Sequence, residues 1–131
     1  MGSYRDLIVW QKGMELVTEV YRLSKTFPKD ELYGLTSQLR RCAVSVPSNI
    51  AEGHARNSSG DYARFLRVAC GSLYELETQI EVARNLGYLN ARSFGGTTQL
   101  TREIGRMLGA LISKVEGGVR SGHRPPGKTR P

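Results

Sequence analysis

The chain has 131 residues, of which 39% are hydrophobic and 24% charged, and none of its apolar runs approaches the ~18 residues of a membrane-spanning helix. This length and composition predict one soluble domain that buries a core without disulfides or a metal, and they exclude a membrane protein. Residues 1–6 lack the apolar stretch of a secretory signal, so we expect a cytoplasmic protein.

The net charge of +7 is concentrated at the end of the chain. Residues 1–116 carry +3, whereas residues 117–131 carry +4 and no acid. Because the last segment also holds four glycines, three prolines and a single aliphatic residue, we expect it to be disordered. It either attracts phosphate backbones in a salt-dependent way or only keeps the protein in solution. Its basic residues are Arg120, Arg124, Lys128 and Arg130.

The first helix is expected from Asp6, a good N-cap residue, to about Lys25, because apolar residues recur at helical spacing between them. Phe27-Pro28 should end this helix, with the Phe27 ring packed under the turn. We expect Trp10 to be largely buried. The predicted core stripe consists of Leu7, Trp10, Met14, Val17, Val20 and Tyr21.

The second helix is expected to start at Lys29 and to end near Gly53, its predicted C-cap. Pro47 lies inside the helical pattern, where it removes one hydrogen-bond donor and crowds the carbonyl group of Ala43. Since the apolar stripe keeps its phase after the proline, we expect one continuous helix with a kink at Pro47. The predicted stripe is Leu32, Leu35, Leu39, Cys42 or Ala43, Val46 and Ile50.

The third helix should occupy most of residues 58–89 and form the centre of the fold, because its apolar residues recur at steps of four and three. Ser58 and Asp61 form a pattern like a capping box, and Gly87 should close the helix. On its outer face, Glu81 is placed to pair with Arg84. The predicted seam is Tyr62, Leu66, Ala69, Leu73, Leu76, Ile80 and Ala83.

The fourth helix is expected from Asn90, its N-cap, to about residue 116. Glycines make it the weakest of the four, and we expect fraying before Thr98. Glu103 is placed to pair with Arg106. The predicted stripe is Leu100, Ile104, Met107 or Leu108, Leu111 and Val115.

Four helices with short connections predict an all-α protein, an antiparallel up-down-up-down four-helix bundle over residues 1–116, followed by a basic disordered tail over residues 117–131. Some apolar side chains of the third helix lie off its seam, and a lone bundle has no core position for most of them. We therefore expect them to contact a second copy of the chain. These side chains are Phe65, Val68, Tyr74 and Val82.

No metal, cofactor or catalytic site is expected. Cys42 and Cys70 fall inside predicted helices and are interpreted as small buried apolar residues. Neither His54 nor His123 stands three residues after a glutamate, as the di-iron bundles require. Since there is also no phosphate-binding glycine loop and no nucleophile with a matching base, the sequence predicts a non-enzymatic protein without a small-molecule substrate.

Five arginines are candidates for nucleic-acid binding, because arginine suits bidentate phosphate contacts better than lysine. Two lie on the second helix and three around the turn to the third, which separates the groups by roughly 14 Å along the hairpin. The pattern predicts two small patches on one subunit, or else ordinary solvated arginines. The five are Arg40, Arg41, Arg56, Arg64 and Arg67.

Four segments carry a family resemblance. They are VWQK at residues 9–12, GLTSQLRR at residues 34–41, SVPSNIAEG at residues 45–53, and the stretch from RFL to ELETQ at residues 64–79. With these segments in unbroken order over residues 4–115, the chain resembles the bacterial four-helix-bundle family, also called the 23S rRNA intervening-sequence protein family.

The resemblance implies an antiparallel four-helix bundle that assembles as a homopentameric ring. The family includes the accessory variability determinants of diversity-generating retroelements, which work with a reverse transcriptase and its template RNA through basic surface. Residues 93–98 are neutral here where the family is usually acidic, and the tail is unusually basic, so both departures favour nucleic acid.

The implied partners are other copies of the chain, structured RNA or DNA, and a reverse transcriptase. The alternative is a protein-only oligomeric adaptor of the intervening-sequence type, with no direct role in nucleic-acid binding.

Overall fold

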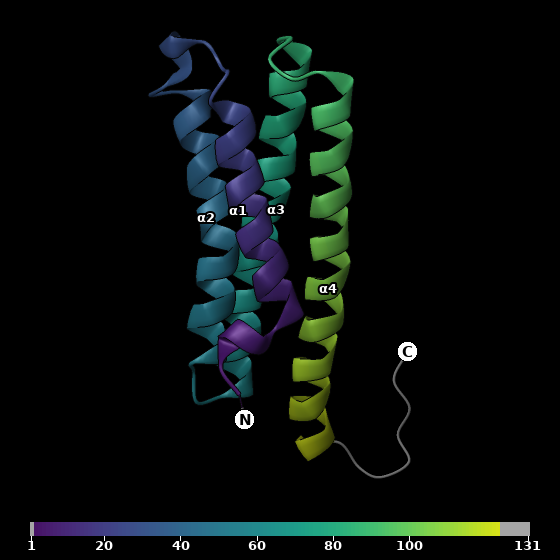
Figure 1. Cartoon of the computed structure of the whole chain (residues 1–131). Coiled ribbons are helices and arrows are strands. Elements are labelled where there is room, and N and C mark those ends of the chain that lie inside the picture. Colours follow the sequence, from purple (N-terminus) through teal and green to yellow (C-terminus); the bar gives the residue numbers. More distant parts are fainter. Residues whose placement is uncertain (1, 124–131) are drawn as a thin grey trace.

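Four long helices form the protein in the computed structural model, which describes the backbone of residues 2–123 and the side chains of residues 2–117 (Figure 1). The helices are α1 (Ile8–Ser24), α2 (Leu35–His54), α3 (Ser59–Asn85) and α4 (Ala91–His123). Two short 3-10 turns, η1 (Tyr4–Asp6) and η2 (Lys29–Glu31), precede α1 and α2. Each helix runs antiparallel to the next, and α4 also packs against α1, which confirms the predicted all-α four-helix fold.

The core runs along the axis where the four helices meet. Every residue of the predicted α3 seam is buried except Tyr62, which is half-buried. No helix in the described part of the chain is long and apolar enough to cross a membrane. The largest fully buried apolar side chains are Leu16, Val20, Leu39, Val46, Ile50, Leu66, Leu73, Leu76, Ile80, Ile104 and Leu108.

The start of α1 differs from the prediction. Asp6 belongs to η1, where its carboxylate accepts a hydrogen bond from the Ser3 backbone N–H at 3.2 Å. The Ser3 hydroxyl in turn accepts from the Arg5 N–H at 3.1 Å. The expectation that Asp6 caps α1 is therefore wrong, because its side chain completes a capping box one turn earlier.

The predicted stripe of α1 matches the buried face only in part. Met14 and Tyr21 are 43% and 41% exposed, whereas Leu16 and Leu23, which the stripe lacks, are buried together with Val20. The reason is Gly13, where an added Cβ would lie only 3.2 Å from the Pro47 Cβ. Because this glycine lets α1 approach α2 closely, the face that carries it packs inward. Apolar residues surround α1 on most sides, so spacing alone did not select this face.

Two aromatic side chains on α1 and its following turn have different surroundings. Trp10 is mostly buried against the core, as expected, and meets the Tyr4 ring edge-on, with ring centroids 5.2 Å apart. Phe27 is buried as expected and packs against the Tyr88 ring at 5.3 Å. The second contact ties the α1–α2 connection to the end of α3.

α2 passes through Pro47 without a break, as predicted. The Asn49 side-chain amide donates hydrogen bonds to the Ser45 carbonyl at 2.8 Å and to the Ser45 hydroxyl at 2.9 Å, next to the position where the proline lacks an N–H. The kink at Pro47 stays a prediction. The expected start at Lys29 is wrong, since η2 and a turn come first and Leu32 is 48% exposed.

Gly53 is a point of contact between helices rather than a C-cap. It lies in the last turn of α2, without a positive φ angle, and Ala55 is the C-cap. A Cβ on Gly53 would come within 2.8 Å of the Phe65 Cβ and 3.1 Å of the Tyr62 ring. The glycine is therefore needed because α3 passes directly over it.

The turns around α3 follow the sequence closely. The Ser58 hydroxyl accepts from the Asp61 N–H at 3.1 Å and caps α3. Gly87, with φ of 80°, ends the helix, and the N–H groups of Gly87 and Tyr88 bond back to its last turn. The Asn90 side chain accepts from the Ser93 N–H at 2.8 Å and caps α4. All three capping residues are confirmed.

α4 is helical from Ala91, including the segment before Thr98 that was expected to fray. Gly95, Gly96 and Gly109 have no neighbouring atom within 4 Å of an added Cβ, so packing does not require them. The helix also runs to His123, beyond the expected boundary at residue 116. Residues 124–131 lie outside the described residues, and disorder of the tail stays a prediction.

Candidate nucleic-acid interface

The predicted arginines around the α2–α3 turn form one cluster. The guanidinium groups of Arg56 and Arg64 each lie 4.6 Å from the centroid of the Phe65 ring. Arg56 pairs with Glu52 at 2.6 Å and Arg64 with Asp61 at 3.7 Å. Because the side chains remain 41% and 62% exposed, the pair presents two oriented cations to solvent.

Arg67 forms an ion pair between two helices. Its guanidinium pairs with the Glu116 carboxylate and so ties α3 to α4. The Arg67 side chain is 59% exposed, but the carboxylate neutralises it locally. Arg67 therefore bridges two helices, whereas Arg56 and Arg64 pair with acids close to them in sequence.

Arg40 and Arg41 are neighbours in sequence but differ in their contacts. Arg40 donates from its Nε to the Ser24 hydroxyl at 2.9 Å and lies 4.6 Å above the Tyr21 ring, so it joins α2 to α1. Arg41 is exposed and has no acidic partner in the described part of the chain. By the rise per residue of a helix, they lie about 23 Å from Arg56 along the bundle axis. That these arginines form two binding patches stays a prediction.

Sequence reasoning missed the strongest basic feature, which is the outer face of α4. Four exposed cations fall within about a third of its circumference, on the side opposite Ile104 and Leu108. No acid in the described residues forms an ion pair with any of them. We call this surface the α4 stripe. Its members are Arg92, Arg102, Arg106 and Lys114.

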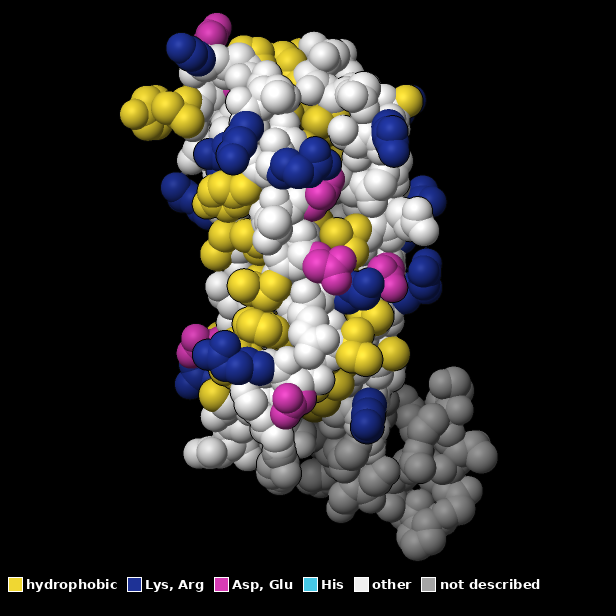
Figure 2. Space-filling view, in the orientation of Figure 1, with side chains coloured by type: hydrophobic (Ala, Val, Ile, Leu, Met, Phe, Trp, Pro, Cys, Tyr) yellow, Lys and Arg dark blue, Asp and Glu magenta, His cyan; other side chains and the backbone are white. Residues whose placement is uncertain are grey.

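The α4 stripe is unpaired because both acids in residues 91–117 are engaged by other helices. Glu103 pairs with Lys12 of α1 at 3.6 Å, so its predicted pairing with Arg106 is wrong. Glu116 pairs with Arg67 of α3. The stripe extends for about 33 Å along the helix. Figure 2 shows Lys and Arg side chains over α4, along the right-hand edge of the molecule. The spacing of Arg102 and Arg106, four residues apart, was the signal that could have found it.

The other expected contacts have mixed outcomes. Glu81 pairs with Arg84 at 3.9 Å as predicted, and Arg84 also lies 4.5 Å from the Phe94 ring centroid. His54 is half-buried and meets Tyr62 edge-on. The side chains of Arg120, Arg124, Lys128 and Arg130 lie outside the described residues.

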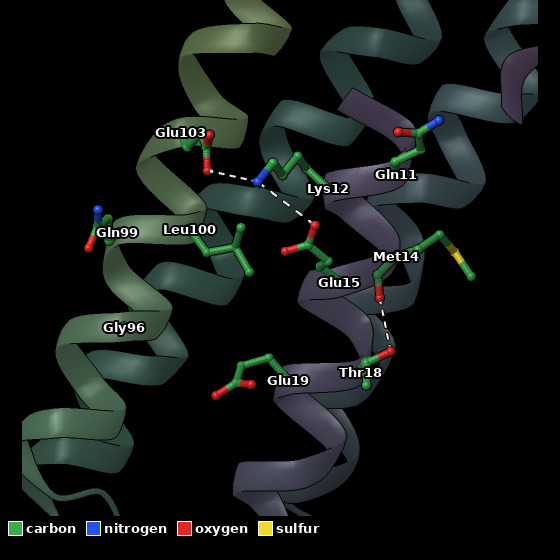
Figure 3. A pocket seen from close by; sticks show the side chains of 10 residues that line it. All are labelled: Gln11, Lys12, Met14, Glu15, Thr18, Glu19, Gly96, Gln99, Leu100 and Glu103. Carbon is green, nitrogen blue, oxygen red and sulfur yellow. Dashed lines mark hydrogen bonds and ion pairs between the residues drawn. The ribbon is translucent and has the colours of Figure 1, made fainter. Parts of the chain in front are cut away.

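A hollow of about 780 Å³ lies between α1 and α4, and its charges do not suit nucleic acid. Figure 3 shows Lys12 between Glu15 and Glu103, with Nζ to carboxylate distances of 3.8 and 3.6 Å. Glu19, whose carboxylate pairs with Arg22, also lines the hollow, so the lining holds more carboxylates than cations and does not favour phosphate. None of the predicted arginines lines it.

Metal-ligating residues do not gather anywhere in the described part of the chain, where no group of three or more His, Cys, Asp or Glu is placed to hold an ion. Cys42 and Cys70 are free thiols on α2 and α3. Burial raises the pKa of both, and at Cys42 the Glu75 carboxylate raises it further.

Comparisons with known proteins agree on the fold and the family. The structure superposes with a TM-score of 0.75 on a Bacteroides thetaiotaomicron protein of unknown function from the S23 ribosomal protein family. That likeness covers 81% of this chain and 96% of the other, at 20% identity, and so concerns the fold. A search of curated proteins gave no match. The sequence model of the 23S rRNA-intervening sequence proteins matches residues 5–110. The chain belongs to the 23S rRNA-intervening sequence protein family.

Proposed function

We propose that this chain is a cytoplasmic, non-enzymatic accessory protein that binds structured RNA or DNA through the α4 stripe. The observation that carries the proposal is a line of four exposed cations without acidic partners in the described residues. Cations along one helix face are the usual footprint of a phosphate backbone. Arg56 and Arg64, oriented by Phe65, supply a second contact at the α2–α3 turn, the end of the bundle where α4 finishes.

The test is the salt dependence of binding to an RNA stem-loop. A double variant, Arg102→Gln with Arg106→Gln, should weaken binding and reduce the slope of log K against log salt by about 2. The matched control is Lys25→Gln with Lys29→Gln, which removes the same charge from an exposed part of the chain. Equal effects of the two double variants, or absence of any RNA shift at low salt, would contradict the proposal.

The proposed partner in the cell is a reverse transcriptase with its template RNA, in the manner of the accessory proteins of diversity-generating retroelements. Family resemblance and the basic charge support this proposal. Its test is co-purification: the wild-type protein should retain a co-expressed reverse transcriptase and its template RNA. Retention of neither would argue against this role while leaving RNA binding by the stripe intact.

A homopentameric ring is the proposed assembly. Apolar side chains exposed by 40% or more lie on α1, α2 and α3, where a neighbouring copy would cover them. They include Val68, Tyr74 and Val82 of α3, three of the four residues expected to contact a second copy. A ring would repeat the α4 stripe five times and let individually weak phosphate contacts act together.

A protein-only adaptor is the second candidate function, and the same exposed apolar side chains favour it. In that case a partner protein would cover them and RNA affinity would be absent at every salt concentration. The stem-loop titration therefore separates the two candidates.

A further inference from the structure

A polar cleft of about 510 Å³ lies between α2 and α3, away from the α4 stripe. Its volume falls within the range of small-ligand sites. We call it the α2–α3 cleft. Its lining is almost entirely polar, although it lies between two packed helices. The lining residues are Tyr33, Ser37, Gln38, Arg41, Cys42, Ser45, Ser72, Glu75 and Gln79.

The inner wall of the cleft is held in place by hydrogen bonds between the helices. The hydroxyl groups of Ser45 and Ser72 lie 2.7 Å apart, and Asn49 holds Ser45 from the next turn. The Gln79 amide nitrogen donates to the Gln38 side-chain oxygen at 3.3 Å. These contacts make the cleft a preformed site rather than a gap between mobile side chains.

Two acceptors in the cleft lack a strong donor. The Gln79 side-chain oxygen is buried and has no hydrogen-bond partner in the described residues, a costly state for a polar atom. Glu75 forms no ion pair in the described residues, and its carboxylate lies beside the Cys42 thiol. The Glu75 carboxylate is therefore an acceptor in the cleft without a cationic partner in the described residues, which suits a ligand that brings adjacent N–H donors.

The rim supplies an aromatic ring and a cation. Tyr33 is 93% exposed, the most exposed large apolar side chain in the described residues. Arg41 stands on the same rim, without an acidic partner in the part of the chain described. Aromatic rings stack on unpaired bases, and arginine binds phosphate, so the rim suits a nucleotide.

We propose that the α2–α3 cleft binds one unpaired guanine nucleotide. The Watson–Crick edge of guanine presents two adjacent donors, N1–H and the N2 amino group, and the two oxygens of the Glu75 carboxylate accept them. Tyr33 stacks on the base and Arg41 contacts its phosphate. Uracil has one such donor, while adenine and cytosine place their amino group beside an acceptor, so these bases fit less well. When the guanine belongs to a bound RNA strand, this inference rests on the proposed function.

The first experiment compares RNA stem-loops that differ at one loop position in an otherwise uridine loop. The full chain should bind the guanine loop about 5- to 100-fold more tightly than the inosine loop, which lacks only the N2 amino group. Free guanosine monophosphate should compete for the cleft, and adenosine monophosphate should not. Equal affinity for the guanine and inosine loops would overturn the proposal.

Variants of the cleft residues test whether the preference for guanine arises in the cleft. Glu75→Gln should abolish the preference for guanine over inosine, whereas Glu77→Gln on the same helix should keep it. Tyr33→Ala should weaken binding of every loop about tenfold, within the range for loss of one stacked base, and leave a loop-free duplex unaffected. The control is Leu86→Ala, which removes a 53% exposed apolar side chain outside the cleft. Circular dichroism shows whether each variant is folded, and a folded Glu75→Gln that keeps the preference contradicts the assignment.

Failure of the cleft and failure of the proposed function give different results. If the protein binds stem-loops through Arg102 and Arg106 but shows no preference for guanine, the assignment of the cleft is wrong and the proposed function stands. If no stem-loop binds but guanosine monophosphate binds and needs Glu75, the cleft is a site for the free nucleotide and the proposed function is wrong. If neither ligand binds, both are wrong.

Discussion

Gly53 is the residue at which α2 and α3 come closest. An alanine there would place its Cβ 2.8 Å from the Phe65 Cβ, so one helix must move away. We predict that Gly53→Ala lowers the free energy of unfolding by about 1–3 kcal/mol, as overpacking does, measured by urea denaturation. Gly71→Ala is the matched control. No atom lies within 4 Å of its added Cβ, and it should raise the stability by up to about 1 kcal/mol.

The two thiols are predicted to be slow nucleophiles. Burial raises the pKa of Cys42 and Cys70, so less thiolate is present at pH 8 than in a free cysteine. Alkylation by iodoacetamide, followed by mass spectrometry, should be slower in the folded protein than in urea. Since the unfolded chain loses these protons at a lower pH than the folded protein, the stability should fall as the pH rises above the ordinary cysteine pKa. A thiol that reacts as fast as free cysteine in the folded protein would contradict the assigned burial.

At the scale of elements, the turn between α3 and α4 depends on Gly87. Its φ of 80° is unfavourable for a side chain with a Cβ. We predict that Gly87→Ala lowers the free energy of unfolding by about 1 kcal/mol. Gly87→Asn should cost less, because asparagine tolerates the left-handed conformation better. Equal losses in thermal unfolding for the two variants would show that the backbone angle is not the cause.

The ends of α3 and the start of α4 were predictable because capping there is local. Ser58, Gly87 and Asn90 act within three or four residues of their own positions, so the sequence contains both partners of each contact. Gly13 and Gly53 were not predictable in the same way. Their role depends on Pro47 and on Phe65, which belong to other helices.

The candidate site shows the same division. The positions of the cations on α4 could be predicted from their spacing, but their lack of acidic partners could not. The cations lack partners because Glu103 pairs with Lys12 of α1 and Glu116 pairs with Arg67 of α3. Likewise, nothing in the sequence showed that Arg40 would donate a hydrogen bond to Ser24 while Arg41 stayed exposed.

The whole molecule is predicted to be an assembly. Sedimentation at micromolar concentration should give a mass close to five times the 14.5 kDa of one chain. The physical reason is the exposed apolar surface on α1, α2 and α3, which a neighbouring copy would remove from water. A mass of one chain would rule out the ring and the repeated α4 stripe, but it would leave the stripe of a single subunit to be tested by its own variants.

The glycines of α4 should make it the helix whose backbone opens to solvent most often. Gly95, Gly96 and Gly109 weaken this helix without improving its packing, so it should open locally more often than α2 or α3. Its amide hydrogens should then exchange with deuterium first. Because α4 also carries the unpaired cations of the stripe, contact with a polyanion should stabilise this helix more than the others. Slower deuterium exchange confined to α4 would then report binding even where the affinity is weak.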